Sequence, residues 1–533
     1  MMAIKEKRFL FILLIASIAL LTISAITPAI YSKSKNIYEK IQVLNQIITI
    51  VNENYVEPVN WDEVMDGAFY GLLERLDPHS AYISKERIED ISERFHGKFE
   101  GIGIEFDLLG GYITVISPIA GSPSELAGLQ PGDQIIEIEG ESAYKITKDQ
   151  VFKKLRGPKG TTVNITVRRV GLEEPLHYQI TRDEIPIYSV TGAFMLDEKT
   201  GYIRLSRFAS TSSKEVEEAL QKLINNGMTR LIFDLRTNSG GYLEQAAEIS
   251  DKFITTRDTL VYTAGRIQDS HQIYLSNPDR GYGDFALIVL INRWSASASE
   301  IVAGAIQDLD RGLIIGETSF GKGLVQRQWM LKDNSALRVT IGRYYTPGGR
   351  LIQRPYSDGA HKYYTELIDE NRETRLDSVI KDRPKYKTRG GRIVYGGGGI
   401  TPDVYLTPKK VNVSTNRIVG HPERLTFNWG TEFASYHKDE WSSLSEFKGE
   451  FEISDDLFFE FISYVKEKNL KINEEEIQKD QDYVKTILKA QIAGALWGKE
   501  AYYEILILSD NQIKEGFYHF DEARKFIANN QYE

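Results

Sequence analysis

The first hydrophobic pattern in the chain is one continuous run. Residues 9–31 carry no charged side chain, and Lys5, Lys7 and Arg8 precede them. Its core, the 18-residue stretch "FLFILLIASIALLTISAI", approaches the ~20 apolar residues that cross a bilayer as a helix and exceeds the ~7 to 15 usual in a signal peptide. We therefore expect a retained membrane anchor over 1–31, with a cleaved signal peptide as the alternative. The basic flank stays in the cytoplasm, which puts the rest of the chain outside the inner membrane, in the periplasm or another extracytoplasmic space.

After this run the hydrophobic spacing becomes helical and then strand-like. Residues 36–75 have apolar positions at helical spacing, which predicts two helices that end at the turn "LDPHS". Short alternating runs divided by Gly, Pro and Asp follow, with one helical piece over 148–155. The pattern predicts an N-terminal helical region over 32–97 and a small β-rich domain over 98–183.

Strand-like and helix-like segments alternate in the next part of the chain. "YIRLSRF", "TRLIFDL", "FALIVLIN" and "GLIIGE" have the character of buried strands, and amphipathic helical segments lie between them. This alternation predicts an α/β core over 184–409. Residues 410–533 have helical periodicity and predict a helical appendage, either a scaffold packed on the core or a device for substrate tethering or dimerisation.

Composition narrows the function. A chain of 533 residues has room for roughly three or four domains. Its net charge of -10 argues against nucleic acid as the main partner, because phosphate binding needs a basic surface. It contains no cysteine, which excludes disulfides, thiol nucleophiles and cysteine zinc sites.

The stretch "SASASE" (295–300) follows a predicted core strand and leads into a predicted helix. Reactive groups of α/β folds collect at such corners. Ser297 has two interpretations here. It can be a helix cap, because Ser297 and Glu300 three residues later have the sequence pattern of a capping box. It can also be a nucleophile held at the strand-to-helix corner.

Two other stretches supply what a nucleophilic serine needs. In "DLRTNSGGYL", Gly240 and Gly241 can present backbone N–H groups to an oxyanion, and the amide of Ala298, after the nucleophile, is a second donor. A plain glycine turn is the alternative. In "SFGKGLVQ", Lys322 and Gln326 share one face if the stretch is extended, so Gln326 can hold the lysine amine. An ordinary lysine is not a base at pH 7, but burial can lower its pKa by several units.

The β-rich segment resembles a PDZ domain. "GIGI", which is Gly101, Ile102, Gly103 and Ile104, stands where that family has its carboxylate-binding loop, and "GLQPGDQIIEIEGE" matches the following turn and strand. Glycines there free successive N–H groups to converge on a carboxylate, while the neighbouring strand edge pairs with an extended peptide. The resemblance implies a module that captures protein C-termini.

The stretch "NRWSASASEIVAGAIQDLDRGLIIGETSFGKGLVQ" resembles the active-site block of the carboxyl-terminal processing peptidases, or tail-specific proteases. The similarity also covers "LDPHSAYIS", the PDZ segment, "DLRTNSGGYL" and "GGGGITPDVYL". It implies a serine endopeptidase that needs no metal or other cofactor and acts on proteins with free C-termini. In that family the positions of Ser297 and Lys322 form a Ser/Lys dyad, and Gln326 orients the lysine. The resemblance also puts Gly240 or Gly241 with Ala298 in the oxyanion hole, and Arg156 where the PDZ domain is coupled to the site.

Three alternatives remain at this point. A Ser/His/Asp triad would need one of eight histidines, and His271 is the one that lies near the presumed site in the chain. An acyl-CoA-type hydrolase on a similar α/β core would not need a peptide-binding domain, and a non-catalytic PDZ scaffold would not need Ser297, Lys322 and Gln326. The sequence leaves the substrate, any adaptor and any homo-oligomer undetermined. The eight histidines are His79, His96, His177, His271, His361, His421, His437 and His519.

Overall fold

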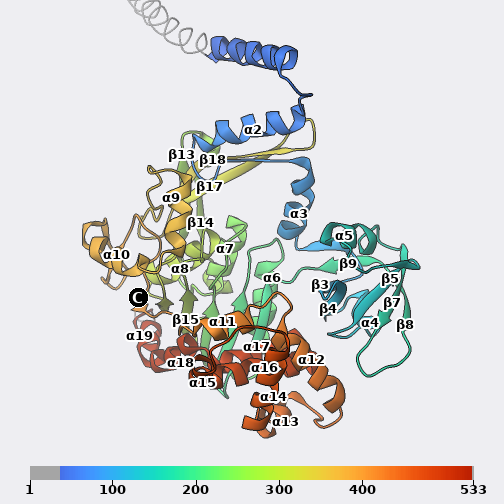
Figure 1. Cartoon of the computed structure of the whole chain (residues 1–533). Helices are drawn as coiled ribbons and strands as arrows, with labels where there is room; N and C mark the ends of the chain where they lie inside the picture. Colours follow the sequence, from blue (N-terminus) through green and yellow to red (C-terminus); the bar gives the residue numbers. More distant parts are fainter. Residues whose placement is uncertain (1–36, 531–533) are drawn as a thin grey trace, which may run out of the picture. The chain divides into compact units, whose positions relative to one another are not determined.

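The structure is a computed structural model that describes residues 37–530 (Figure 1). The predicted anchor over 1–31 lies outside these residues. No helix within 37–530 combines the length and apolar character that a membrane span requires. The chain divides into two units, one that ends at Arg75 and one that begins at Leu76. In the first unit, residues 37–54 are helical and α2 follows at Trp61–Glu74, which confirms the two helices predicted from the spacing.

The second unit begins with a short strand and a helix, β1 (Ala81–Ile83) and α3 (Lys85–His96). Gly97 ends α3 in the left-handed conformation (φ 73°), and its N–H donates to the carbonyl of Glu93. The next strand, β2 (Lys98–Gly101), pairs antiparallel with β9 (Asp183–Pro186). This two-stranded ladder joins the points where the chain enters and leaves the β-rich domain.

The β-rich domain is an antiparallel sheet in the order β3-β4-β5-β7-β8 around its own buried cluster. Its helix α5 runs over Lys148–Leu155, as the sequence predicted. β3 is the first strand of this order, so among the described strands it pairs with β4 alone and its other edge is open. The strands are β3 (Ile104–Leu109), β4 (Tyr112–Pro118), β5 (Gln134–Ile138), β7 (Thr162–Arg168) and β8 (Leu176–Thr181).

The predicted α/β core is confirmed as a six-stranded sheet in the order β10-β11-β12-β15-β16-β21. All neighbours from β11 to β21 are parallel, and β10 is antiparallel to β11. Every residue of β15 is buried, as expected for a parallel strand covered on both faces. The strands are β10 (Val190–Met195), β11 (Thr200–Leu205), β12 (Arg230–Asp234), β15 (Ala286–Ile291), β16 (Leu313–Gly316) and β21 (Val404–Tyr405).

The two faces of this sheet are covered by helices from distant parts of the chain. On one face, α6 (Ser212–Asn225), α7 (Leu243–Asp251) and α8 (Ala298–Asp308) pack against alternate strand residues such as Phe233. On the other, residues of α18 (Asn511–Tyr518) and α19 (Phe520–Asn530) pack against the remaining set. The end of the predicted appendage is therefore built into the α/β core.

A second, antiparallel sheet carries Gln326, another residue of the predicted site. Its long strand β18 (Ala336–Tyr345) pairs with β1, β13 and β17. The shorter strands are β13 (Thr259–Gly265), β14 (Gln272–Leu275) and β17 (Leu324–Met330). Between β18 and β21 the chain forms α9 (Ala360–Thr365), α10 (Arg372–Val379), β19 (Lys385–Lys387) and β20 (Ile393–Tyr395).

The remaining helices form a body with its own hydrophobic cluster, which contains Trp429, Phe447, Phe461 and Leu488 among others. We call these helices, α11 to α17, the helical region (orange to red in Figure 1). The domain boundaries drawn from the sequence stay predictions. The helices are α11 (Val413–Val419), α12 (Leu425–His437), α13 (Leu444–Glu450), α14 (Asp455–Glu467), α15 (Glu474–Lys479), α16 (Gln481–Trp497) and α17 (Lys499–Leu506).

Candidate active site

Two of the three serines in "SASASE" tie the corner after β15 to the corner after β12. The hydroxyl of Ser295 donates to the carbonyl of Leu235 at 2.8 Å, and the hydroxyl of Ser299 donates to the carbonyl of Asn238 at 2.8 Å. Both serines are fully buried. They hold the glycine-containing loop against the start of α8, which leaves Ser297 as the candidate nucleophile.

Ser297 lies at the predicted strand-to-helix corner, immediately before α8, in an unusual backbone conformation. Its φ is 56° and its ψ is -112°, whereas a helix N-cap normally has extended backbone angles. Such a conformation costs roughly 1–3 kcal/mol in a non-glycine residue and persists where the surrounding structure enforces it, often at active sites. The Ser297 N–H donates to Glu300 Oε2 at 2.8 Å. A capping role therefore explains the hydrogen bond between Ser297 and Glu300 but not the unusual backbone angles of Ser297.

The glycine loop offers backbone donors beside Ser297. The N–H of Gly240 already donates to Asn238 Oδ1 at 2.9 Å, while no acceptor is recorded for the N–H of Gly241 among residues 37–530. Ala298 is the first residue of α8, and the first N–H groups of a helix lack an intrahelical acceptor. Of the three predicted oxyanion residues, Gly241 and Ala298 are thus the better donors.

Gly240 instead leaves room for Ser297 and Ala298, because it has no side chain. Its φ is 99°, and a Cβ at this position would lie 2.8 Å from Ser297 Cβ and 3.0 Å from the N of Ala298. Any side chain here would press on the candidate nucleophile and on one of its oxyanion donors.

Lys322 meets Gln326 as the sequence predicted. The Lys322 amine donates to Gln326 Oε1 at 2.9 Å, and Gln326 Nε2 donates in turn to the carbonyl of His79. The strand itself begins only at Leu324, so Lys322 lies in the segment just before it. The lysine amine is held by a side chain that is itself anchored to the "LDPHS" turn.

The surroundings of Lys322 favour its neutral form. Burial, and after it the positive charge of Arg338, lower the pKa of Lys322 from 10.5 to about 8, against the opposing charges of Glu300 and Asp77. With such a pKa about a tenth of the molecules carry a neutral lysine at pH 7 and about half at pH 8. Lys322 can therefore serve as a base near neutral pH.

Glu300 joins the two corners that carry the candidate pair. Its Oε2 accepts from the N–H groups of Ser297 (2.8 Å) and Lys322 (2.9 Å), and its Oε1 accepts from the N–H of Gly321 (2.6 Å) and the hydroxyl of Ser319 (2.5 Å). Burial raises the pKa of Glu300 to about 7, although these four hydrogen bonds oppose the rise. The sequence showed Glu300 only as a capping residue.

Tyr344 makes a second link between the same residues. Its buried hydroxyl lies 3.1 Å from the carbonyl oxygen of Ser297 and 2.5 Å from that of Lys322. In the described part of the chain no hydrogen bond joins Ser297 Oγ directly to the Lys322 amine. Catalytic hydrogen bonds are often loose before substrate binds. The pair is thus positioned through Glu300 and Tyr344.

The histidine near the site is His79, which sequence reasoning passed over in favour of His271. The ring Nε2 of His79 lies 3.1 Å from the Tyr363 hydroxyl, and burial together with the charge of Lys322 lowers the pKa of His79 to about 3. His271 is exposed, with its ring nitrogen 2.9 Å from the carbonyl of Gly265. Neither ring forms a hydrogen bond with Ser297 among residues 37–530. The signal that could have found His79 was the "LDPHS" motif itself.

The predicted carboxylate loop lies between β2 and β3. Gly103 has a φ of 83°, and a Cβ there would lie 2.2 Å from Ser122 Cβ, so this position requires glycine. The carbonyls of Ile102 and Gly103 accept from Ser124 and Ile119, whereas no acceptor is recorded for the N–H of Ile102 or Gly103 within 37–530. The Ile102 side chain is buried in the domain core. The N–H groups of Ile102 and Gly103 are therefore available as donors, and their binding of a carboxylate stays a prediction.

Arg156 lies at the end of α5 and contacts the segment that leads to the α/β core. Its guanidinium donates to Glu93 of α3 at 2.8 Å and lies over the rings of Phe99 (5.0 Å) and Phe152 (4.7 Å). α3 follows β1, whose Ala81 pairs with Arg338 on β18. The predicted coupling residue thus contacts the helix that connects the β-rich domain to the sheet beside Lys322.

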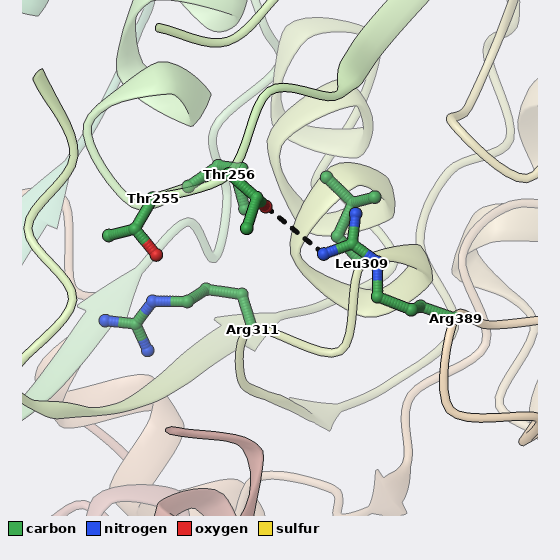
Figure 2. Close-up of a pocket in the computed structure, with 6 residues that line it drawn as sticks. Thr255, Thr256, Leu309, Arg311 and Arg389 are labelled. Atoms are coloured by element: carbon green, nitrogen blue, oxygen red, sulfur yellow. Dashed lines mark hydrogen bonds between the residues drawn. The ribbon is translucent and has the colours of Figure 1, made fainter. Parts of the chain in front are cut away.

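A pocket rich in arginine lies at the other end of α8 (Figure 2). Arg389 donates to Thr256 Oγ1 at 3.2 Å, and Arg311 donates from Nε to the carbonyl of Phe253 at 2.8 Å. The pocket adjoins Leu309, whereas Ser297 precedes the first residue of this 11-residue helix, a length of ~16 Å. These arginines fix loops of the core and are separate from the candidate pair.

Comparisons with known families agree with this anatomy. Peptidase family S41 matches residues 199–358, and the PDZ domain family matches 114–169. The N-terminal domain of the activating protease CtpB matches 22–87, and a family of unknown function matches 426–498. The matched peptidase segment contains the whole candidate pair with its oxyanion loop.

Individual relatives point the same way. A carboxy-terminal-processing protease of Bartonella bacilliformis is 36% identical over 330 residues, which is 60% of this chain and 74% of the relative. The carboxy-terminal processing protease CtpB of Bacillus subtilis is 32% identical over 62% of this chain and 69% of its own length. A solved structure, the photosystem II D1 C-terminal processing protease, is similar at 25% sequence identity, but its TM-score of 0.34 over 72% of this chain and 92% of that one adds nothing to the family assignment. This chain belongs to the carboxy-terminal processing proteases, serine peptidases of family S41, and carries their PDZ domain.

Proposed function

We propose that this protein is an exported endopeptidase that captures protein C-termini with its PDZ domain and cleaves the captured chain with a Ser297/Lys322 dyad. Gln326 orients the lysine, and the N–H groups of Gly241 and Ala298 form the oxyanion hole. Arg156 couples the PDZ domain to the site through Glu93. The observation that carries the proposal is a partly buried lysine with a lowered pKa, held by Gln326 and joined through Glu300 to a serine in a strained corner.

The chemistry follows from these positions. The neutral Lys322 amine accepts the proton of the Ser297 hydroxyl as Oγ attacks the scissile carbonyl carbon. The negative charge that develops on the carbonyl oxygen is met by the N–H groups of Gly241 and Ala298. The lysine ammonium then gives its proton to the departing amine, which leaves an ester on Ser297. Water, deprotonated by the same lysine, hydrolyses this acyl-enzyme.

Two of the alternatives raised by the sequence are not consistent with family membership. An acyl-CoA-type hydrolase and a non-catalytic scaffold would each have to retain a peptidase segment together with a PDZ domain for some other purpose. A histidine base is disfavoured on physical grounds. With a pKa of about 3, His79 is too weak a base to take a serine proton efficiently near pH 7.

The dyad is tested by substitution in the full chain. We expect Ser297→Ala and Lys322→Ala each to abolish cleavage of a peptide substrate while circular dichroism and thermal unfolding stay close to those of the parent protein. His271→Ala is the matched control and should keep full activity, and His79→Ala tests the histidine that lies near the site. Full activity in Lys322→Ala would overturn the mechanism.

The proposed location rests on the basic flank and the apolar run over 9–31. A protease added outside the inner membrane should digest the catalytic domain in intact spheroplasts, and membranes should retain the chain after a high-salt wash. Recovery of a shortened soluble form would instead indicate a cleaved signal peptide.

A further inference from the structure

The open edge of β3 is the strand at which an extended peptide would add to the PDZ sheet. Successive side chains of β3 point to opposite faces. Ile104, Phe106 and Leu108 pack against the domain's hydrophobic cluster. Glu105 and Asp107 therefore lie on the opposite face.

That opposite face is contacted by the helical region. Lys499, the first residue of α17, pairs with Glu105 at 2.5 Å, and Arg424, just before α12, pairs with Asp107 at 2.9 Å. Both cations are half-exposed, with 42% and 46% of their side chains accessible. Two alternate residues of the peptide-binding strand thus each face a cation from a distant part of the chain.

Further observations indicate that this contact is specific. Arg424 adopts the left-handed conformation (φ 48°, ψ 55°), which costs roughly 1–2 kcal/mol in a residue other than glycine. α12 also approaches the turn before β5, because a Cβ on Gly132 would lie 3.4 Å from Thr431 Cβ. The backbone at the start of α12 is held in a strained form that presents Arg424 to Asp107.

The first face of β3 has a different environment. Phe106 makes an edge contact with Phe152 of α5, with ring centroids 5.4 Å apart. Lys148, at the start of α5, pairs with Asp107 at 3.1 Å. The first face of β3 is therefore apolar, whereas on the opposite face Lys148 of α5 and two cations of the helical region, Arg424 and Lys499, pair with Glu105 and Asp107.

We propose that the helical region is the second wall of the tail-binding groove and that Arg424 and Lys499 select acidic side chains at every second position of the captured tail. A tail that pairs with β3 presents alternate side chains to the two faces. One set lies against α5, and the other lies beside the half-exposed cations. This inference rests on the proposed capture of C-termini by the PDZ domain and assigns a role to helices α12 and α17.

The test measures tail binding to the full chain carrying Ser297→Ala, so that no peptide is consumed. Fluorescent ten-residue peptides with free C-termini carry glutamate or lysine either at the first and third positions before the terminal residue, or at the second and fourth. Fluorescence anisotropy at low ionic strength gives each dissociation constant. We expect glutamate to be preferred over lysine by about tenfold in one alternating set, and about equal affinities in the other set.

The preference should depend on the two cations. In the chain that also carries Arg424→Gln and Lys499→Gln, we expect the preference to fall to about twofold or less, while the uncharged parent peptide binds within about threefold of its original affinity. Lys485→Gln is the matched control, because Lys485 pairs with Asp455 inside the helical region and should leave the preference unchanged. Each single variant, Arg424→Gln or Lys499→Gln, should give an intermediate preference and guards against loss of folding in the double variant.

Two results would overturn the inference, and they are distinguishable. If free tails bind more tightly than amidated ones but show no alternating charge preference, or keep it in the double variant, the helical region does not read the tail and the proposed function stands. A uniform loss of affinity for every tail in the double variant would also overturn the inference, because it would show that the helical region supports the groove without selecting side chains of the tail. If free and amidated tails bind equally, capture of C-termini fails and this inference fails with it.

Discussion

The candidate active site and the outer face of β3 both depend on charged residues, but they use charge in opposite ways. At the candidate active site, Glu300 is completely buried and Lys322 is partly buried, and burial moves both pKa values towards neutrality, to about 7 for Glu300 and about 8 for Lys322. On the face of β3, Glu105 and Lys499 remain half-exposed, with 45% and 42% of their side chains accessible. In the functions proposed above, the first region uses charge for proton transfer and the second uses it for recognition.

The two regions differ because their charged side chains are exposed to water to different extents. A charge taken out of water is expensive, so a buried lysine gives up its proton more easily and a buried glutamate holds its proton more tightly. A half-exposed pair contributes only ~0.2–1 kcal/mol, and its members can exchange partners with a ligand at little cost. Burial therefore suits a catalytic base, while exposure suits a surface that must release one partner to accept another. Substitutions should accordingly have large effects at the first region and small ones at the second.

Outside the proposed dyad, the largest effect should come from Gly240→Ala. The new Cβ would lie 2.8 Å from the carbonyl oxygen of Ala296 and from Ser297 Cβ, so the nucleophile and its oxyanion donors must move. Misplacement of about 1 Å at a reacting group costs about 10²-fold or more in rate. We expect kcat/KM for a peptide substrate to fall by at least that factor.

The matched control for this substitution is Gly227→Ala. Gly227 also has a positive φ, 88°, but a Cβ there has only the carbonyl of Glu198 nearby, at 4.0 Å. Both variants bear the backbone strain of a non-glycine residue at positive φ, and the close contacts at Gly240 add a further loss of thermal stability, but of the folded proteins only Gly240→Ala should lose activity. Equal activity in the two variants would show that Gly240 is an ordinary turn residue.

Glu300→Gln should have the next largest effect. A glutamine amide can replace only one of the two carboxylate oxygens, so its NH₂ group faces either the N–H groups of Ser297 and Lys322 or the N–H of Gly321 and the hydroxyl of Ser319. Buried donors without partners cost ~1–3 kcal/mol each, and the corner would relax to recover them. We expect kcat to fall by about 10- to 100-fold with little change in KM, measured by steady-state kinetics.

The control for this charge change is Glu218→Gln, which alters an exposed carboxylate on α6 that pairs with Lys214 at 3.8 Å. It should leave kcat, KM and the melting temperature unchanged. If Glu300→Gln also kept full kcat, the carboxylate would be a helix cap alone, as the capping pattern in the sequence first indicated.

Gly240 and Glu300 show how much of the candidate site could be predicted from the sequence. Gly240, Ser297, Lys322 and Gln326 lie within short motifs, and the strands and helices that carry them follow from hydrophobic periodicity. The bonds of Glu300 to Gly321 and Lys322, and that of Gln326 to His79, join residues far apart in the chain, 247 positions in the last case. The pattern along the chain predicts which way a side chain points, but it does not predict which residue of a distant loop forms a hydrogen bond with it.

The helical C-terminal part makes the same point at a larger scale. Its helices were predictable because each has an apolar stripe. Their partners were not, because a stripe does not identify what covers it. Phe520 and Ala523 of α19 pack against the parallel sheet, while Phe447 and Phe461 pack within the helical region. Only the fold separates the part that completes the protease core from the part that approaches β3.

A smaller effect is expected from the tail itself. If the N–H groups of Ile102 and Gly103 receive a substrate carboxylate, an amidated tail should be captured about tenfold less well, because hydrogen bonds to a charged group contribute roughly 1.5–3 kcal/mol. Cleavage of matched acid and amide peptides well below saturation measures this, and the enzyme is the same in both arms. Equal rates would mean that the open N–H groups of the loop do not bind the terminus.

The smallest effect, and the one that bears most directly on the role of burial, is expected from Arg338→Gln. The general base must be neutral, so kcat/KM should rise with pH through the pKa of Lys322, about 8, and level off above it. Burial is the main cause of the lowered pKa and the charge of Arg338 the second, so removing that charge lets the pKa rise and moves the ascending limb of the profile to higher pH. At pH 7 the rate should fall by about two- to fivefold, while above pH 9 the variant and the parent should converge. A rate loss that is equal at every pH would show that Arg338 acts by packing, through its contacts with Gln328 and Phe95, and that burial alone sets the base.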